Sequence, residues 1–330
     1  MRPFSTRACL TTSRRVFETC PRRRWLSTPP PCPPLGLGLE GEAPSTLTHV
    51  HLASDQLGGH PSYANAALLQ SGLRQLFLSH KSSPGTTPAP SPFVLSFTPP
   101  PTYTLGRRQS ALNSDQEARL RRPLQVTTEG DRQEQSFTPT VVETDRGGLT
   151  TYHGPGQIVL WPILDIHSQH HNQFTVRSYA RLLETTTQAV LSRLNISTYL
   201  SSADPGIWVT PHHATGAPER KIAALGVHLR RHITGLGVAL NIDVAVDGGE
   251  TINPWSRFVP CGLEGKAVTN IRQELGGSAW DELLRQHADV ASLRLHIAER
   301  WVEELSRQIG TDAVRHKSIR ENDLIPSLAP

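Results

Sequence analysis

Two kinds of side chain in this sequence could carry covalent chemistry, and the first is cysteine. The 330 residues include four cysteines, of which only Cys261 lies beyond residue 32. A lone cysteine in the body of the chain has no partner for an internal disulfide, and no Cys-X-X-Cys pair is present to hold zinc. Cys261 could be a nucleophile if a base lies beside it, although a small buried hydrophobe is the simpler interpretation of a single cysteine.

The second scarce residue is lysine. Only four of the 33 basic residues are lysines, and Lys221 opens an apolar segment at residues 221–227. A solvated charge at a strand end would explain it, but lysine, unlike arginine, can lose its proton when desolvated. A nearby ammonium also favours the thiolate of a cysteine, whose ordinary pKa is about 8.5. Lys221 and Cys261 are therefore a chemically sensible pair, but forty residues separate them and the sequence does not show that they touch.

A glycine-rich segment at residues 146–157 is the third candidate. It holds four glycines between two strand-like runs, so its backbone could approach a ligand closely. Arg146 could meet a carboxylate or phosphate, and His153 adds a titratable ring. A glycine-rich hairpin with a satisfied histidine explains the same residues equally well. No His-Glu-X-X-His or paired acidic spacing accompanies His153, so we predict no metal site.

Helices and strands alternate irregularly around these segments. Apolar residues recur with helical spacing at residues 62–80, at 174–194 and, as two helices, within 278–308. Short apolar runs predict strands at residues 50–52, 93–97, 141–144, 157–166, 207–209, 222–230 and 233–242. Pro162 interrupts one of these runs and indicates an edge, a bend or a bulge there. The mixture predicts a single α/β or α+β domain.

The basic character of the chain belongs to its N-terminus. Seven arginines and one acid lie in the first 25 residues, and the rest of the chain has 26 basic and 28 acidic residues. The pI near 9.0 is therefore no sign of nucleic-acid binding. An arginine-rich, acid-poor leader predicts a mitochondrial transit peptide at 1–26. We expect a Pro/Gly-rich linker at 27–47, a globular domain at 48–310 and a polar C-terminal tail at 311–330.

Two other classes of function are disfavoured. Residues 36–41 match Gly-X-Gly-X-X-Gly, but no strand precedes them and no helix follows, so we do not expect a dinucleotide loop. No run of 18 apolar residues occurs, so no membrane span is expected.

Several motifs resemble those of the lipoyl(octanoyl) transferases, also called lipoate–protein ligase B. Residues 146–157 resemble the RGGXXTYHGPGQ signature of that family, and residues 97–106 resemble its EHPPVFTLG-type segment. Lys221 falls on the lysine of the KIAXXGV motif, and Cys261 falls on the cysteine of PCG. The strand at 206–209 also resembles a family segment. These matches keep the family order over roughly residues 48–300, and the leader makes the chain similar to a mitochondrial, fungal-type member.

The resemblance implies a fold, a reaction and partners. The fold is the biotin/lipoate protein ligase-like catalytic domain, with mixed sheets and flanking helices. The reaction moves octanoate from the phosphopantetheine thioester of an acyl carrier protein to a specific lysine of a lipoyl domain. The acceptors are lipoyl domains of 2-oxoacid dehydrogenase complexes and the H protein of glycine cleavage, in the mitochondrial matrix. No ATP or separate cofactor is needed, because the thioester arrives already activated.

The resemblance also assigns roles to residues. Cys261 forms the acyl-enzyme, and Lys221 lowers the pKa of that cysteine and later accepts a proton from the incoming amine. The residues expected to line the acyl site, by their place in the motifs, are Arg146, Gly147, Gly148, Leu149, Thr150, Thr151, Tyr152, His153, Ala224, Leu225, Gly226, Gly237, Val238 and Ala239.

Some positions depart from the family pattern. Thr98 stands where Glu is usual, Leu236 where many members have His, Ala224 where Ser is common and Asn270 where Ser is usual. Three alternatives stay open: an ATP-dependent lipoate or biotin ligase, a non-catalytic acyl- or lipoyl-domain-binding protein, and a cysteine hydrolase. The cysteine of the PCG motif and the absence of a GRGRXG- or RRXSGGG-like stretch argue against the ligase.

Overall fold

The computed structural model describes residues 42–55, 59–127, 134–202, 204–210, 218–258 and 265–324. The predicted transit peptide, the Gly-X-Gly-X-X-Gly match at 36–41 and most of the predicted linker lie outside these residues. Cys261 lies outside them as well.

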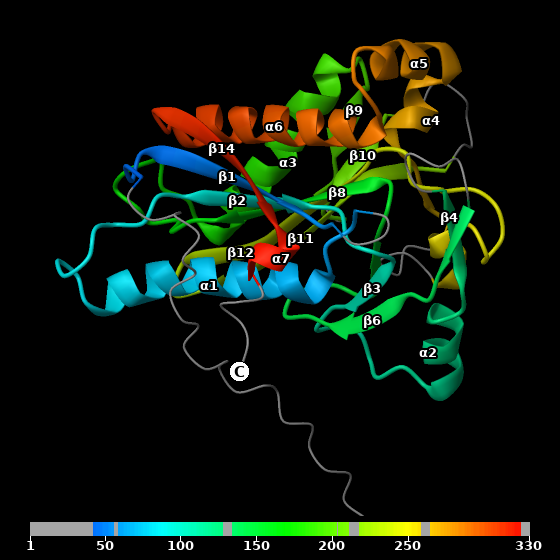
Figure 1. Ribbon diagram of the computed structural model, residues 1–330, viewed down its shortest axis with the longest axis horizontal. Helices are drawn as coiled ribbons and strands as arrows, with labels where there is room; N and C mark the ends of the chain where they lie inside the picture. Colours follow the sequence, from blue (N-terminus) through cyan, green and yellow to red (C-terminus); the bar gives the residue numbers. More distant parts are fainter. Residues whose placement is uncertain are drawn as a thin grey trace, which may run out of the picture. The chain divides into compact units, whose positions relative to one another are not determined.

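One large mixed sheet organises the described part of the chain (Figure 1). Its β14–β1 and β1–β2 pairs are parallel, and the pairs from β2 to β9 are antiparallel. The strand order is β14 (Ala313–Arg320), β1 (Thr46–Ala53), β2 (Phe93–Phe97), β8 (Gln157–Ile163), β12 (Ile233–Asn241), β11 (Arg220–Arg230), β10 (Ile207–Val209) and β9 (Thr198–Leu200), with β13 (Ala267–Val268) beside β11.

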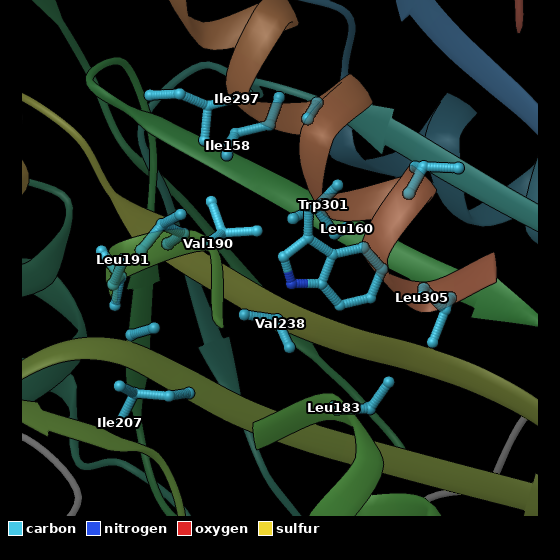
Figure 2. Packing of buried hydrophobic residues seen from close by; sticks show 14 of the residues in the cluster. Ile158, Leu160, Leu183, Val190, Leu191, Ile207, Val238, Ile297, Trp301 and Leu305 are labelled. Carbon is cyan, nitrogen blue, oxygen red and sulfur yellow. The ribbon is translucent and has the colours of Figure 1, made fainter. Parts of the chain in front are cut away.

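Helices cover both faces of this sheet, as the alternation of side chains along β8 requires. Ile158 and Leu160 belong to one apolar cluster, with residues of α3 (Val176–Arg193) and α6 (Val290–Ile309). Figure 2 shows Trp301 of α6 packed in that cluster. The intervening Val159 and Trp161 belong to a second cluster with α1 (Tyr63–Ser82) and α7 (Glu321–Leu324). A strand buried on both faces reads as a continuous apolar run, which is how β8 appears in the sequence.

Two small sheets stand beside the large one. The first has the order β6 (Thr140–Glu143), β3 (Thr102–Leu105) and β7 (Thr151–His153). The second pairs β4 (Leu124–Thr127) with β5 (Glu134–Phe137), next to the short helix α2 (Ser114–Leu120). Tyr103, Tyr152, Leu120, Leu124 and Val244 form a third apolar cluster here. This cluster holds β7, and with it the glycine-rich segment.

Pro162 lies in an interior strand, so of the three expected possibilities the edge position is excluded. It pairs with Val94 on one side, while the ladder to β12 stops at Leu160 and resumes only as an isolated bridge at Asp165. At this break, polar groups on both strands bond to side chains instead of completing the ladder. The Leu236 amide donates to Gln70 Oε1 (3.1 Å), and the Thr234 hydroxyl donates to the Pro162 carbonyl (2.8 Å). Pro162 is thus accommodated by a local break in the ladder.

The remaining predicted elements agree closely with the structure, and the α/β fold class is confirmed. The three long predicted helical regions correspond to α1, α3 and the pair α5 (Gly277–Arg285) and α6. Residues 109–138 contain α2, β4 and β5, which weak patterning did not reveal. Among the helices that the structure describes, none combines the length and apolar character that crossing a bilayer needs.

The C-terminal boundary at residue 310 was wrong. Residues 313–320 form β14, which pairs with β1 along eight positions, and Ile319 and Leu324 are buried in the second cluster. Mostly polar residues hide this strand from hydrophobic periodicity, since backbone pairing rather than side-chain burial defines it.

Glu321 ties this C-terminal segment to the start of α1, which gives a test of its structural role. Its buried carboxylate accepts hydrogen bonds from the Ser62 amide (2.8 Å), Asn65 Nδ2 (2.7 Å) and the Ser54 hydroxyl (2.9 Å). We expect Glu321→Ala to lower the free energy of unfolding by about 1–3 kcal/mol, because these donors lose their acceptor. Urea unfolding measures the effect, with exposed Glu117→Ala as the control. Equal stability of the two variants would show that the C-terminal segment is dispensable.

Candidate active site

The glycine-rich segment is held against the large sheet by Arg146. Its guanidinium donates to the Thr104 carbonyl (2.6 Å) and hydroxyl (2.9 Å) of β3. Its aliphatic stem lies on Gly226 of β11, where an added Cβ would come within 2.9 Å of Arg146 Cδ. Gly148 turns the loop with φ +88°, a conformation that favours glycine. Arg146 therefore braces the loop, and Gly226 provides the space for it.

Tyr152 and His153 follow on β7 and are both buried. Tyr152 packs against Tyr103 and Trp255, each with ring centroids 5.4 Å apart. His153 stacks on Tyr63 at 5.7 Å, and its Nδ1 has no hydrogen-bond partner among the described residues. Burial, and then the charge of Arg146, lowers the pKa of His153 to about 3. The His153 ring is therefore neutral at physiological pH. The hairpin interpretation assumed a histidine with all its hydrogen bonds made, and Nδ1 does not meet that assumption among the described residues.

Lys221 is not a solvated strand-end charge. Lys221 is only 8% exposed, and its Nζ donates to the Pro205 carbonyl at 3.2 Å. The same Nζ lies 4.6 Å from the centre of the Trp208 ring. Lys221 is therefore a buried amine whose described partners are a carbonyl oxygen and an aromatic ring.

A small cavity of about 30 Å³ unites Lys221 with part of the glycine-rich segment. Five of its residues were predicted: Thr150, Thr151, Tyr152, Lys221 and Ala224. Five were not: Gln157, Asn241, Trp255, Phe258 and Val268.

An amide pair crosses one wall of this cavity. Gln157 Nε2 donates to Asn241 Oδ1 (2.7 Å), and Asn241 Nδ2 donates to the Thr269 carbonyl (2.9 Å). These bonds join β8, β12 and the segment that follows β13. Gln157 ends the segment that resembles RGGXXTYHGPGQ, and this position was the signal that could have identified it.

The segment that carries Cys261 begins and ends near Lys221. Phe258, the last described residue before it, lines the cavity together with Lys221. After it, β13 pairs with β11 so that Val268 lies beside Lys221, and the Thr269 amide donates to the Lys221 carbonyl at 3.0 Å. The contact between Cys261 and Lys221 stays a prediction, because Cys261 is outside the described residues.

Other predicted residues lie around the cavity or away from it. The side chains of Leu225 and Val238 pack with the first apolar cluster, on the face covered by α3 and α6 (Figure 2 for Val238). Ala239 belongs to the opposite cluster, and Gly237 pairs with Gly226 across β11 and β12. Gly147, Gly148 and Leu149 form the loop that Arg146 braces.

The positions that depart from the family pattern have structural partners. The Thr98 hydroxyl donates to the Gln157 carbonyl at 2.6 Å, next to the amide pair. Leu236 takes a positive φ of 60° at the Pro162 break. Asn270 caps α4 (Ile271–Leu275) by accepting the Gln273 amide at 2.7 Å. In the part of the chain that the structure describes, no group of three or more His, Cys, Asp and Glu side chains could hold a metal ion.

The fold and the site together define an α/β catalytic domain built around a buried lysine and a braced glycine-rich loop. The chain belongs to the family of the lipoyl protein ligase A/B catalytic domain, whose model matches residues 74–292. The predicted family and its fold are thereby confirmed.

Two sequence relatives agree with this assignment, and one solved structure is reported beside them for comparison. The chain is 33% identical over 213 residues to a Schizosaccharomyces pombe protein named "Probable octanoyltransferase", covering 64% of this chain and 81% of that protein. It is 32% identical over 205 residues to a Xenopus tropicalis protein named as a mitochondrial octanoyl-[acyl-carrier-protein]:protein N-octanoyltransferase, covering 62% and 72%. A solved lipoate protein ligase from Thermoplasma acidophilum aligns with 86% of this chain and 92% of its own, at 11% identity and a TM-score of 0.49.

The contact between Arg146 and Gly226 gives a direct test of the site's construction. We expect Gly226→Ala to lower the free energy of unfolding by about 1–3 kcal/mol, because its Cβ would overpack the Arg146 stem. Gly249→Ala is the matched control, since nothing lies within 4 Å of its Cβ position. Urea unfolding of both variants measures the difference. A Gly226→Ala protein as stable as the control would show that the brace is not tight.

Proposed function

We propose that this protein transfers an octanoyl group from the thioester of an acyl carrier protein to a lysine of a lipoyl domain, through a thioester on Cys261. The observation that carries the proposal is the position of Lys221. Its buried amine shares a cavity with Phe258 and Val268, which lie on either side of the segment that holds Cys261. The names of the S. pombe and Xenopus relatives support the same activity.

The chemistry divides into two exchanges. The Cys261 thiolate attacks the carbonyl of the donor thioester, and the carrier's sulfur leaves as a thiol after taking a proton from the Lys221 ammonium. The neutral amine of the acceptor lysine then attacks the acyl-enzyme, Lys221 accepts its proton, and the Cys261 thiolate is released. The first exchange replaces one thioester with another, while the second forms a more stable amide. The two exchanges together therefore need no ATP.

The acyl chain would lie among the aromatic walls of the cavity. Each buried methylene contributes about 0.8 kcal/mol, so the fit of an eight-carbon chain can select its length. A cavity of about 30 Å³ has room for little more than a water molecule. Trp255 and Phe258 are only partly buried, so we propose that they move apart when the chain enters.

The partners and the compartment follow from the same reaction. The acceptors we propose are lipoyl domains of 2-oxoacid dehydrogenase complexes and the H protein of glycine cleavage, and the donor's phosphopantetheine replaces any separate cofactor. The mitochondrial name of the Xenopus relative and the arginine-rich leader at 1–26 support a location in the mitochondrial matrix.

Lys221→Arg separates charge from proton transfer. Arginine keeps the positive charge but does not release a proton at working pH, so we expect octanoyl transfer to fall at least about a hundredfold. Lys81→Arg is the control, because that lysine lies on α1 and pairs with Asp165. Transfer from octanoyl-carrier protein to a lipoyl domain is followed by mass spectrometry. Full activity of Lys221→Arg would limit this lysine to an electrostatic role.

Cys261→Ala tests the covalent intermediate. When the parent protein is mixed with octanoyl-carrier protein without ATP, we expect its intact mass to rise by one octanoyl group that hydroxylamine removes. The Cys261→Ala variant should show neither this adduct nor transfer. A strict requirement for ATP would instead identify a ligase, and normal transfer by the variant would rule out covalent catalysis by Cys261.

A further inference from the structure

Lys221 shares the ring of Trp208 with a second ammonium. Trp208 lies on β10, is buried, and donates from Nε1 to the Asp204 carbonyl at 3.0 Å. The Nζ atoms of Lys221 and Lys266 each lie 4.6 Å from the centre of its indole ring. Two of the four lysines of the chain therefore meet at one aromatic side chain.

Carboxylates fix only one of these two lysines. Lys266 Nζ forms ion pairs with Asp204 (2.6 Å) and Glu219 (2.8 Å), and Glu219 also accepts from the Tyr199 hydroxyl. Hydrogen bonds to Asp204 and Glu219 raise the pKa of Lys266, which stays an ammonium. Among the described residues, no carboxylate forms an ion pair with Lys221. Its Nζ instead donates to the Pro205 carbonyl and lies over the Trp208 ring.

From this difference we infer that Trp208 is a positioning residue for Lys221, and that Lys266 with Asp204 holds the indole ring in place for it. The inference rests on the proposed role of Lys221 in acyl transfer. An aromatic face attracts an ammonium without fixing a direction, so Nζ can turn toward a reacting group and back without breaking an ion pair. A carboxylate in the same place would bind the charged form far more tightly and oppose loss of the proton.

The charges around Lys221 set the sign of the expected effects. The face of the indole attracts the ammonium form of Lys221 and not the neutral amine, so removal of the ring takes away a contact that only the charged form makes. Lys266 opposes the charge on Lys221, while Asp204 and Glu219 favour it. The neighbouring Arg220 is neutralised by Glu274 at 2.9 Å. Removal of Lys266 leaves the carboxylates of Asp204 and Glu219 without their ammonium partner, so the charged form of Lys221 gains attraction.

The test measures Lys221 itself, independently of transfer. The full-length protein is labelled with acetic anhydride across a pH series, and peptide mass spectrometry follows the modification of Lys221. We expect Trp208→Phe to keep the pH midpoint of Lys221 labelling that the parent shows. Trp208→Leu should lower that midpoint by about half a pH unit to one pH unit. For Trp208→Leu, the acid limb of the pH–rate profile of octanoyl transfer should shift by the same amount. Its kcat should fall about tenfold, while its KM for the carrier protein stays within about twofold of the parent.

Two further variants keep the inference falsifiable. Trp280→Leu is the matched control, because that buried tryptophan lies near Arg272 (6.0 Å) and not near Lys221. If Trp208→Leu does not fold, Lys266→Gln decides, with an expected rise in the midpoint of about half a unit. A Trp208→Leu or Lys266→Gln protein that folds and labels like the parent would overturn the inference. Absence of octanoyl transfer by the parent would refute the proposed function alone, because the labelling midpoints do not depend on it.

Discussion

The packing of Arg146 on Gly226 is the contact on which the candidate site depends. It joins the loop of a small sheet to an inner strand of the large one, and it works only because β11 has no side chain at that point. The guanidinium then binds Thr104 on β3, so one residue spans both sheets. Thr150, Thr151 and Tyr152 follow directly along the chain and come to lie over Lys221. The glycine-rich loop is thus a rigid wall of the site, positioned by an internal arginine.

The electrostatics of the site follow from burial. His153 is neutral because burial and Arg146 disfavour its charged form, and Lys221 is held by a carbonyl oxygen and an aromatic ring. The carboxylates of Asp204 and Glu219 are bound by Lys266. The Lys221 amine is therefore held in place by a carbonyl oxygen and an aromatic ring rather than by an ion pair with these carboxylates.

The sequence predicted those parts of the molecule that strong local patterns define. The helices with clear 3.6-residue spacing and the strands at 93–97 and 207–209 appear where they were expected. Helix α2 and strands β4 and β5 were missed because they are short and polar, and their few apolar residues pack against distant partners such as Tyr103 and Val244. Strand β14 was missed because its stability comes from backbone pairing with the opposite end of the chain.

The same distinction applies to the site. Motif spacing correctly grouped Lys221, Ala224 and residues 150–152, which line one cavity. It also included Leu225 and Val238, whose side chains pack in the first apolar cluster. The two-residue alternation of a strand separates Ala224 from Leu225, but it places Lys221 and Leu225 on the same face, so the sequence alone did not draw this distinction. Trp255 could not have been found, because no motif contains it and only the folded chain brings it to Lys221. Phe258 opens the segment of Cys261, but the sequence did not show that it reaches Lys221.

The parallel pairing of β1 with β14 has a consequence for how the protein is made. The first strand of the domain hydrogen-bonds to the last, so the edge of the large sheet stays open until residue 320 has been synthesised. The acceptor that secures the start of α1, Glu321, arrives one residue later. Contacts that span almost the whole chain are the slowest to form during folding. The domain therefore completes its sheet only after β14 has been synthesised, and until then β1 is an unpaired edge strand of the nascent chain.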